Sequence, residues 1–285
     1  MRWLTPFINL LLYSNFWIGA CAAAMALQSH WLLGGRYEWT ALSGFIFCAT
    51  LFLYALHRLA GLKKLLPFTS EGRFQVIFRF RSHIVLYAVA AAGGALWFFL
   101  QLPRSLQWGL LVPAGLSLGY VLPVLGKKRR LRDVHYLKIF LIAAVWSWVT
   151  VLLPALELRA MHEAGTYVMA LERALFIFAI TLPFDIRDLQ IDAFQRVKTL
   201  PGQLGIPAAK RLAAGALAAM TACVLANFFL GTYEWKDLLA LSLSALLTLA
   251  LILPSDRISH DYYFTGVLDG TMLLQFVLVA LAQTL

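Results

Sequence analysis

Nine apolar stretches, each about as long as a membrane is thick, constrain this chain more than any other feature. An α-helix rises about 1.5 Å per residue, so about 20 apolar residues cross a hydrocarbon core about 30 Å thick. Lipid offers the backbone no hydrogen-bond partners, so a spanning segment must be a helix or part of a closed barrel. Runs such as Ala88–Ala92 lack the alternation of barrel strands. We therefore predict an all-α, polytopic membrane protein with about nine transmembrane helices. The predicted spans are roughly 7–27, 39–60, 83–102, 105–124, 138–158, 166–184, 208–230, 236–253 and 263–284.

Composition supports a single membrane-embedded unit. Hydrophobic residues make up 61% of the chain and charged residues only 13%, whereas soluble domains are about half apolar and a quarter charged. No linker or change of composition divides the chain, so we expect one domain over residues 1–285. Cys21, Cys48 and Cys223 lie inside apolar runs without a CxxC pair or a Cys/His cluster. Neither a disulfide framework nor a zinc site is expected.

Basic residues predict the orientation. With the N-terminus inside, 19 of the 24 Lys and Arg residues fall on the inner side and five on the outer side. This bias places loops 61–82, 125–137 and 185–207 in the cytoplasm and the C-terminus outside, in the cell (cytoplasmic) membrane. The net charge of +10 is confined to short loops. It therefore indicates membrane lipids or a phosphorylated ligand as partners and no nucleic acid.

Three aspartates stand together where the sixth span ends. Asp185, Asp188 and Asp192 occupy positions i, i+3 and i+7. At about 100° per residue they fall at about 0°, −60° and −20° around a helix, so the carboxylates share one face. Carboxylates that close repel one another unless a cation joins them, and Mg²⁺ accepts such ligands together with phosphate oxygens. The spacing predicts a Mg²⁺ site, and a solvated helix end capped by aspartates is the structural alternative.

The residues around these aspartates resemble a known family. They are followed by Lys198-Thr199-Leu200-Pro201 and then Gly205. This arrangement resembles the second Asp-rich motif, DxxDxxxD, of the UbiA-type intramembrane prenyltransferase superfamily. A second stretch, from Tyr120 through the basic residues 126–133 to Lys138 and Trp146, resembles the same family.

The resemblance implies a UbiA-like bundle and a reaction. Such enzymes transfer a prenyl group from an isoprenoid diphosphate to a lipophilic, often aromatic, acceptor within the bilayer, with Mg²⁺ as cofactor. Carried over, Asp185, Asp188 and Asp192 are the expected catalytic and metal-binding residues. The basic residues expected to bind the diphosphate are Arg187, Lys198, Arg58, Lys127 and Arg130.

The first Asp-rich motif of the family is missing. At the end of the second span, Tyr54, His57 and Gly61 stand where three aspartates are expected. A neutral histidine is a poor ligand for Mg²⁺, which prefers oxygen. A guanidinium binds phosphate directly, so Arg58 is expected to supply positive charge in place of a metal cluster. The alternative is that Arg58 only reaches toward the membrane interface.

Other polar residues are expected near the cavity. Tyr54, His57 and Asp133 belong to this group, and Glu71 is a further candidate carboxylate. Asp269 lies about two turns inside the ninth span, where a carboxylate is costly unless it is paired or wet. It is expected to face the bundle interior, either to pack helices or to bind an acceptor.

Three functions remain open from the sequence. The first is Mg²⁺-dependent prenyl transfer, favoured by the second motif. A non-catalytic relative that binds isoprenoid lipids or serves as a membrane subunit is favoured by loss of the first motif. A transporter would need broken helices and paired charges at mid-membrane, and only Asp269 points that way.

Overall fold

The structure, a computed structural model, describes residues 8–9, 11–12, 14–61, 81–126 and 129–284. Within these ranges the chain is helical and forms no strand, with a single isolated bridge between Leu125 and Arg129. Eight segments are long and apolar enough to cross a membrane. The all-α, polytopic fold is therefore confirmed, whereas a count of nine is not. The long helices are α2 (Phe16–Gly34), α3 (Ala41–Gly61), α5 (Arg81–Gln101), α8 (Leu137–Ser147), α10 (Ala164–Arg187), α13 (Ile206–Phe229), α14 (Trp235–Ile252) and α15 (Asp269–Ala282).

Two of these spans contain a π-helical segment. Helix α8 continues through η3 (Trp148–Leu152) into α9 (Leu153–Glu157), and η5 (Tyr263–Leu268) precedes α15. Such widened turns are rare and often accompany functional sites.

The fourth predicted span is broken into α6 (Arg104–Gly109) and α7 (Leu111–Val121). Pro113 has no N–H to donate to the carbonyl four residues before it, so the carbonyl of Gly109 loses its helical partner. Trp148 Nε1 donates to that oxygen at 3.1 Å. The tertiary contact satisfies the break, and the two pieces fall short of one continuous spanning helix.

The first predicted span, roughly 7–27, is interrupted: residues 8–9 and 11–12 are helical, but Ser14 and Asn15 form a turn before the long helix. Helix α2 starts at Phe16 rather than residue 7 and extends to Gly34, beyond the predicted end at residue 27. Gln28, Ser29 and His30 ended the apolar run, yet all three are buried inside the bundle. Gln28 Nε2 donates to Gln275 Oε1 at 3.2 Å. Polar residues therefore remain within this span because neighbouring helices supply partners.

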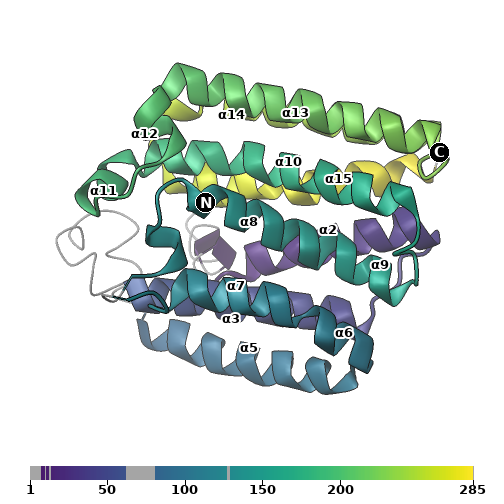
Figure 1. Cartoon of the computed structure of the whole chain (residues 1–285), viewed down its shortest axis with the longest axis horizontal. Helices are drawn as coiled ribbons and strands as arrows, with labels where there is room; N and C mark the ends of the chain where they lie inside the picture. The colour runs from purple at the N-terminus through teal and green to yellow at the C-terminus, as the bar shows by residue number, and fades with distance from the viewer. Residues whose placement is uncertain (1–7, 10, 13, 62–80, 127–128, 285) are drawn as a thin grey trace.

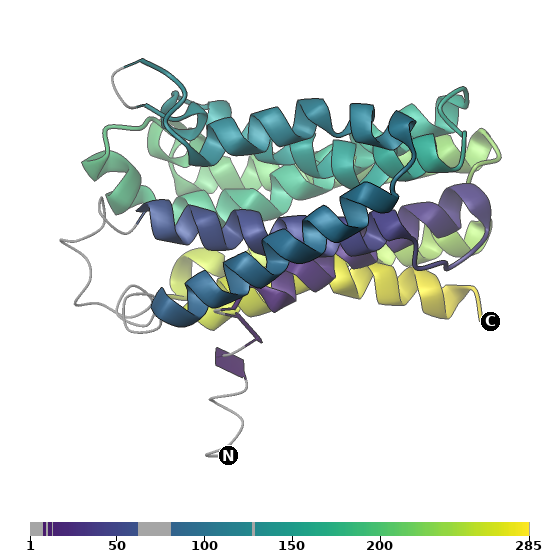
Figure 2. The same cartoon turned by 90° about the horizontal axis from the view of Figure 1, so that it is seen from below.

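The helices pack as layers around a hollow centre. Figure 1 shows α13 and α14 along one edge of the molecule and α5 along the other, with α10, α15, α8, α2, α7 and α3 between them. Figure 2 gives the perpendicular view of the same bundle. Helices α2 and α15 lie side by side, so the first and last long helices are neighbours. The central helices form a ring, and α13, α14 and α5 cover it from outside.

An apolar plug closes one end of this ring. It is a cluster of buried side chains from α2, α3, α6, α9 and the turns beside them, and Ile46, Leu106 and Leu153 are at most 1% exposed. The opposite end carries the termini of α3 and α10, the start of α8 and the Asp-rich segment, and it is called the motif end below. The plug consists of Ala22, Ala26, Leu42, Ile46, Leu102, Leu106, Leu110 and Leu153.

Candidate functional site

A cavity of about 580 Å³ opens at the motif end and extends toward the plug. Its walls come from α2, α3, α7, α8, α10, α15 and the short helix α11 (Leu189–Phe194). Five basic and five acidic side chains line it, whereas its deeper walls are apolar and aromatic. The charged lining residues are Arg58, Arg130, Arg132, Lys138, Arg187, Asp185, Asp188, Asp192, Asp261 and Asp269.

Two motif aspartates converge on a lysine. Asp185 lies in the last turn of α10, and Asp192 lies in α11. Lys138 Nζ, from the first turn of α8, lies 2.7 Å from Asp185 Oδ1 and 3.3 Å from Asp192 Oδ2. All three side chains are buried, and burial raises the pKa of Asp192 above its ordinary value while the Lys138 ammonium opposes that rise. The ammonium therefore occupies a cation position between two carboxylates.

The third motif aspartate has a different partner. Helix α10 ends at Arg187, and Asp188 is the junction before α11. Arg187 Nε lies 2.9 Å from Asp188 Oδ1, and Arg187 Nη1 lies 2.9 Å from Asp261 Oδ1. The same guanidinium lies over the rings of Phe184 and Phe264, at 5.1 and 4.9 Å from their centroids. These contacts orient Arg187 along the cavity wall.

The segment after the aspartates turns the chain. Thr199 caps the short helix α12 (Leu200–Leu204), and its Oγ1 accepts a hydrogen bond from the Gly202 N–H. Gly205 then adopts φ +82°, a conformation that L side chains rarely adopt, and α13 begins at the next residue. Lys198, expected to bind diphosphate, is exposed and does not line the cavity. The stretch from Thr199 to Gly205 therefore has a local structural role.

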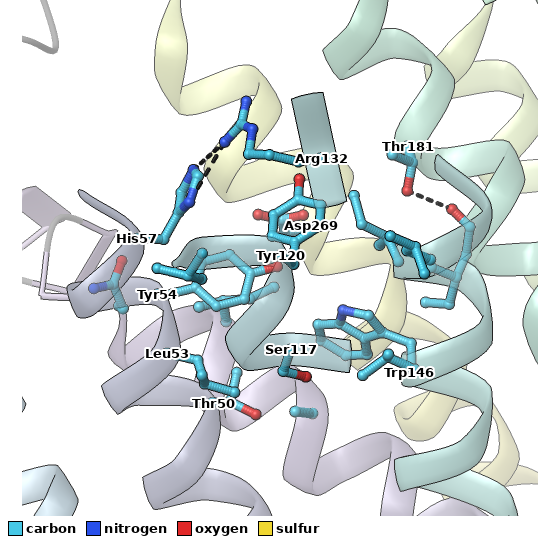
Figure 3. Close-up of a pocket in the computed structure, with 18 of the residues that line it drawn as sticks. Thr50, Leu53, Tyr54, His57, Ser117, Tyr120, Arg132, Trp146, Thr181 and Asp269 are labelled. Carbon is cyan, nitrogen blue, oxygen red and sulfur yellow. Dashed lines mark hydrogen bonds between the residues drawn. The ribbon is translucent and has the colours of Figure 1, made fainter. Parts of the chain in front are cut away.

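The helix α3 side of the cavity is basic and aromatic. Tyr54, His57 and Arg58 all line it, facing the wall that carries the aspartates. Arg58 Nη2 donates to the carbonyl of Leu12 at 3.3 Å. Arg132 reaches His57, with 2.6 Å between Nη1 and Nε2. Figure 3 shows this pair at the cavity wall. Positive charge thus replaces the expected acids on this side.

The two sides differ in their fit to Mg²⁺. Within the described ranges no three His, Cys, Asp or Glu side chains are grouped to hold a metal ion. The α3 side has no carboxylate among Tyr54, His57 and Gly61, so it does not fit. On the other side, Asp185 and Asp192 already hold a stand-in cation, the Lys138 ammonium. Because Mg²⁺ needs only one or two protein carboxylates, this pair fits one ion if Lys138 yields its place.

The deeper part of the cavity is an apolar arm. Tyr54, Tyr120, Trp146 and Asp269 lie at its entrance, with Thr50 and Ser117 further along (Figure 3). Ala22, Ile46 and Leu110 line its end and belong to the plug. On α3, the 12 residues from Arg58 to Ile46 correspond to about 18 Å of helix. The arm has the length and chemistry to hold a hydrocarbon chain of several isoprene units.

The remaining predicted residues are placed as follows. Arg130 lines the cavity, but its guanidinium is paired with Asp133, with Nη2 2.9 Å from Oδ1. Lys127 and Glu71 lie outside the described residues. Asp261 stands outside the spacing patterns that the sequence offers. Lys138 and Arg132 stood in the recognised stretch, but their contacts across the cavity join residues 47 or more positions apart, which no local pattern reports.

Comparisons with known proteins place this arrangement in a fold. No protein-family model matches the chain, and a search of curated proteins finds no match. Solved structures do match. One, described for digeranylgeranylglyceryl phosphate synthase in membranes, has a TM-score of 0.60 at 11% identity and covers 100% of both chains. The apo structure of a UbiA homologue from Aeropyrum pernix K1 has a TM-score of 0.63 at 15% identity, over 95% of this chain and 97% of that one.

Proposed function

We propose that this chain, which has the fold of the UbiA-type intramembrane prenyltransferases, is an enzyme. The proposed reaction transfers a polyprenyl group from an isoprenoid diphosphate to a lipophilic acceptor within the membrane. One observation carries the proposal. The aspartates of the second motif share a single cavity with Arg58, and the same cavity continues into an apolar arm. A charged head and a hydrocarbon tail are what an isoprenoid diphosphate presents.

The charges of the cavity favour Mg²⁺ as the cofactor. The five basic and five acidic lining side chains balance when all are ionised. A diphosphate brings about three negative charges, so a further cation is needed at the site. Asp185 and Asp192 are the residues that would hold Mg²⁺, with Asp188 beside them. The ion would neutralise the charge that develops on the leaving diphosphate.

Residues of the chain supply the rest of the chemistry. Arg58 and Arg132 offer guanidinium groups to the diphosphate from the α3 side, and Lys138, once displaced from its carboxylates, offers an ammonium from α8. The bond between C1 of the prenyl chain and the diphosphate oxygen breaks, which leaves an allylic cation. The rings of Tyr54, Tyr120 and Trp146 stabilise positive charge there through their π faces.

A reconstituted assay tests the proposal. The purified chain in nanodiscs is given radiolabelled geranyl, farnesyl or geranylgeranyl diphosphate, Mg²⁺ and a set of lipophilic phenols and glycerol ethers. We expect a prenylated product with at least one pair, and tight binding of a non-hydrolysable diphosphonate analogue. Binding of the analogue without transfer to any acceptor would indicate an isoprenoid-binding protein. Absence of both would contradict the proposal.

We also propose that the motif end faces the cytoplasm, because the basic loops gather there in the sequence. A variant without native cysteines and with Arg129→Cys should react with a membrane-impermeant thiol reagent only after the cells are opened. A Thr284→Cys variant should react in intact cells. The reverse pattern would contradict this orientation.

A further inference from the structure

Asp269 stands where the last span changes its helical form. It is the first residue of α15, directly after the π-helical segment η5. Trp17 Nε1 on α2 donates to the Gly266 carbonyl at 3.0 Å, and Cys21 Sγ lies 3.4 Å from the Asp269 carbonyl oxygen. The neighbouring Gly270 leaves space for the Trp17 ring, since a Cβ there would lie 3.2 Å from it. Contacts with α2 thus fix the position of this backbone.

The carboxylate of Asp269 faces the cavity. In Figure 3 it lies beside the rings of Tyr54 and Tyr120. The Asp269 carboxylate interacts electrostatically with Arg187, Asp261 and Arg58. Asp269 follows Asp261 by eight residues, which corresponds to roughly 12 Å of helix. Asp261 shares Arg187 with Asp188, so Asp269 lies deeper than that pair, at the level where a prenyl chain would join its diphosphate.

Its hydrogen bonding separates this residue from the other cavity acids. Asp185, Asp188, Asp192 and Asp261 each lie within 3.3 Å of a lysine or arginine nitrogen. No hydrogen bond or ion pair to the Asp269 carboxylate is found among the described residues. A carboxylate at this depth is costly without a partner. A ligand that donates a proton to it would remove that cost.

We propose that Asp269 is the catalytic proton acceptor of the transfer reaction. This proposal rests on the proposed function above. The acceptor would then be a molecule with an acidic O–H, such as a phenol, placed beside Tyr54 and Tyr120. The C1–oxygen bond of the donor breaks and its electron pair leaves with the diphosphate. The acceptor oxygen forms the new bond to C1 as its proton moves to the Asp269 carboxylate. Charge and atoms balance without any further reagent.

The test compares Asp269→Asn with the parent and with Thr271→Val. Thr271 is buried in the same helix, and among the described residues its hydroxyl bonds only to the Leu268 carbonyl. We expect Asp269→Asn to bind the diphosphonate analogue within about twofold of the parent but to transfer to a phenol at least about 100-fold more slowly, as for loss of a general base. Thr271→Val should match the parent in both assays.

The acidity of the acceptor gives a readout that a structural role would not move. A nitrophenol that is already ionised at the assay pH needs no proton acceptor, so Asp269→Asn should transfer to it within about tenfold of the parent. An equal loss with ionised and neutral phenols would overturn the proposal. So would unchanged transfer to the neutral phenol. If Asp269→Asn does not fold, Asp269→Glu takes its place in the test. Retained transfer to neutral phenols by Asp269→Glu supports a carboxylate base. Loss of transfer to both ionised and neutral phenols overturns the proposal. A parent that transfers to no acceptor instead contradicts the proposed function.

Discussion

Helix α10 carries two arginines in opposite surroundings. Arg173 and Arg187 are 14 residues apart, about 21 Å along the helix. Arg173 is 1% exposed, and its guanidinium donates to the Met25 carbonyl at 3.1 Å and to Thr150 Oγ1 and Ser29 Oγ at 3.3 Å. Arg187 lines the cavity between two carboxylates. The first is enclosed by protein, whereas the second has an open side.

The neighbours of the two arginines extend the contrast. Beside Arg173, Tyr233 donates to buried Glu172 at 2.8 Å, and Gln275 bonds to both Gln28 and Ser244. Polar groups in a bilayer need internal partners, so this enclosed network binds helices together. Around Arg187 the charges face a cavity. Depth in the membrane therefore does not by itself identify a functional charge, whereas access to a cavity does.

The largest expected effect comes from breaking the enclosed network. Arg173→Met should lower the free energy of unfolding by about 3–5 kcal/mol, because Glu172 would remain buried without its neighbouring cation. Thermal unfolding in detergent measures it. The double variant with Glu172→Gln should recover part of the loss, and Arg187→Met should cost less than about 1 kcal/mol. Equal costs for Arg173→Met and Arg187→Met would remove the distinction.

The next effect concerns the open cluster. Asp188→Asn should weaken binding of the diphosphonate analogue by about 100-fold or more, while the thermal midpoint stays close to that of the parent, since the variant removes a carboxylate beside the proposed Mg²⁺ site rather than core packing. EDTA should have the same effect on the parent, and added Mg²⁺ should reverse it. Calorimetry or a filter assay in nanodiscs gives both numbers. If neither Asp188→Asn nor EDTA changes the affinity, the aspartates are only a capped helix end and hold no Mg²⁺.

Arg58 offers a smaller test on the α3 side. Arg58→Ala should weaken analogue binding by about 2 kcal/mol, about 30-fold, and Arg58→Lys should restore only part because it lacks the bidentate geometry. Lys198→Ala is the matched control, since Lys198 is exposed and does not line the cavity. We expect it to bind within twofold of the parent. If Lys198→Ala weakens analogue binding more than Arg58→Ala does, the diphosphate does not bind on the α3 side of the cavity.

The smallest effect concerns the apolar arm. Ala49 lines it on α3, about 14 Å of helix from Arg58. Ala49→Leu should fill part of the arm and reduce the affinity for a geranylgeranyl analogue by about three- to tenfold, while a geranyl analogue binds as before. Competition between the two analogues measures the ratio. A uniform change for both lengths would mean that the chain lies elsewhere.

The sequence predicted the helices well where hydropathy alone decides the structure. It failed at both places where tertiary contacts change the outcome. Gln28, Ser29 and His30 interrupt the apolar pattern but lie inside α2, because α10, α15 and other elements supply partners. Pro113 broke a span that the apolar run suggested was continuous. Hydropathy measures how favourably each side chain leaves water, and it carries no information about hydrogen-bond partners on other helices.

The candidate site shows the same division. The i, i+3, i+7 spacing predicted that the three aspartates share one helix face. Helix α10 ends at Arg187 and Asp192 lies in α11, so they do not lie on one helix, although all three line the cavity. The spacing did not predict that Asp185 and Asp192 pair with Lys138 whereas Asp188 pairs with Arg187. Spacing along the sequence predicts the direction in which side chains point from a helix, whereas their charged partners lie on other helices and are not visible in a local pattern. The role of these residues remains a prediction.

The pairing of α2 with α15 affects how the protein assembles during its synthesis and membrane insertion. Gln28 and its partner Gln275 are 247 residues apart. At about 5–20 residues per second, synthesis leaves the first helix without this partner for roughly 12–50 s. During that time Gln28 faces lipid or the insertion machinery, and the ring around the cavity cannot close. Full assembly therefore waits for the last helix to leave the ribosome, and a chain truncated before α15 should be recognised and degraded as an orphan.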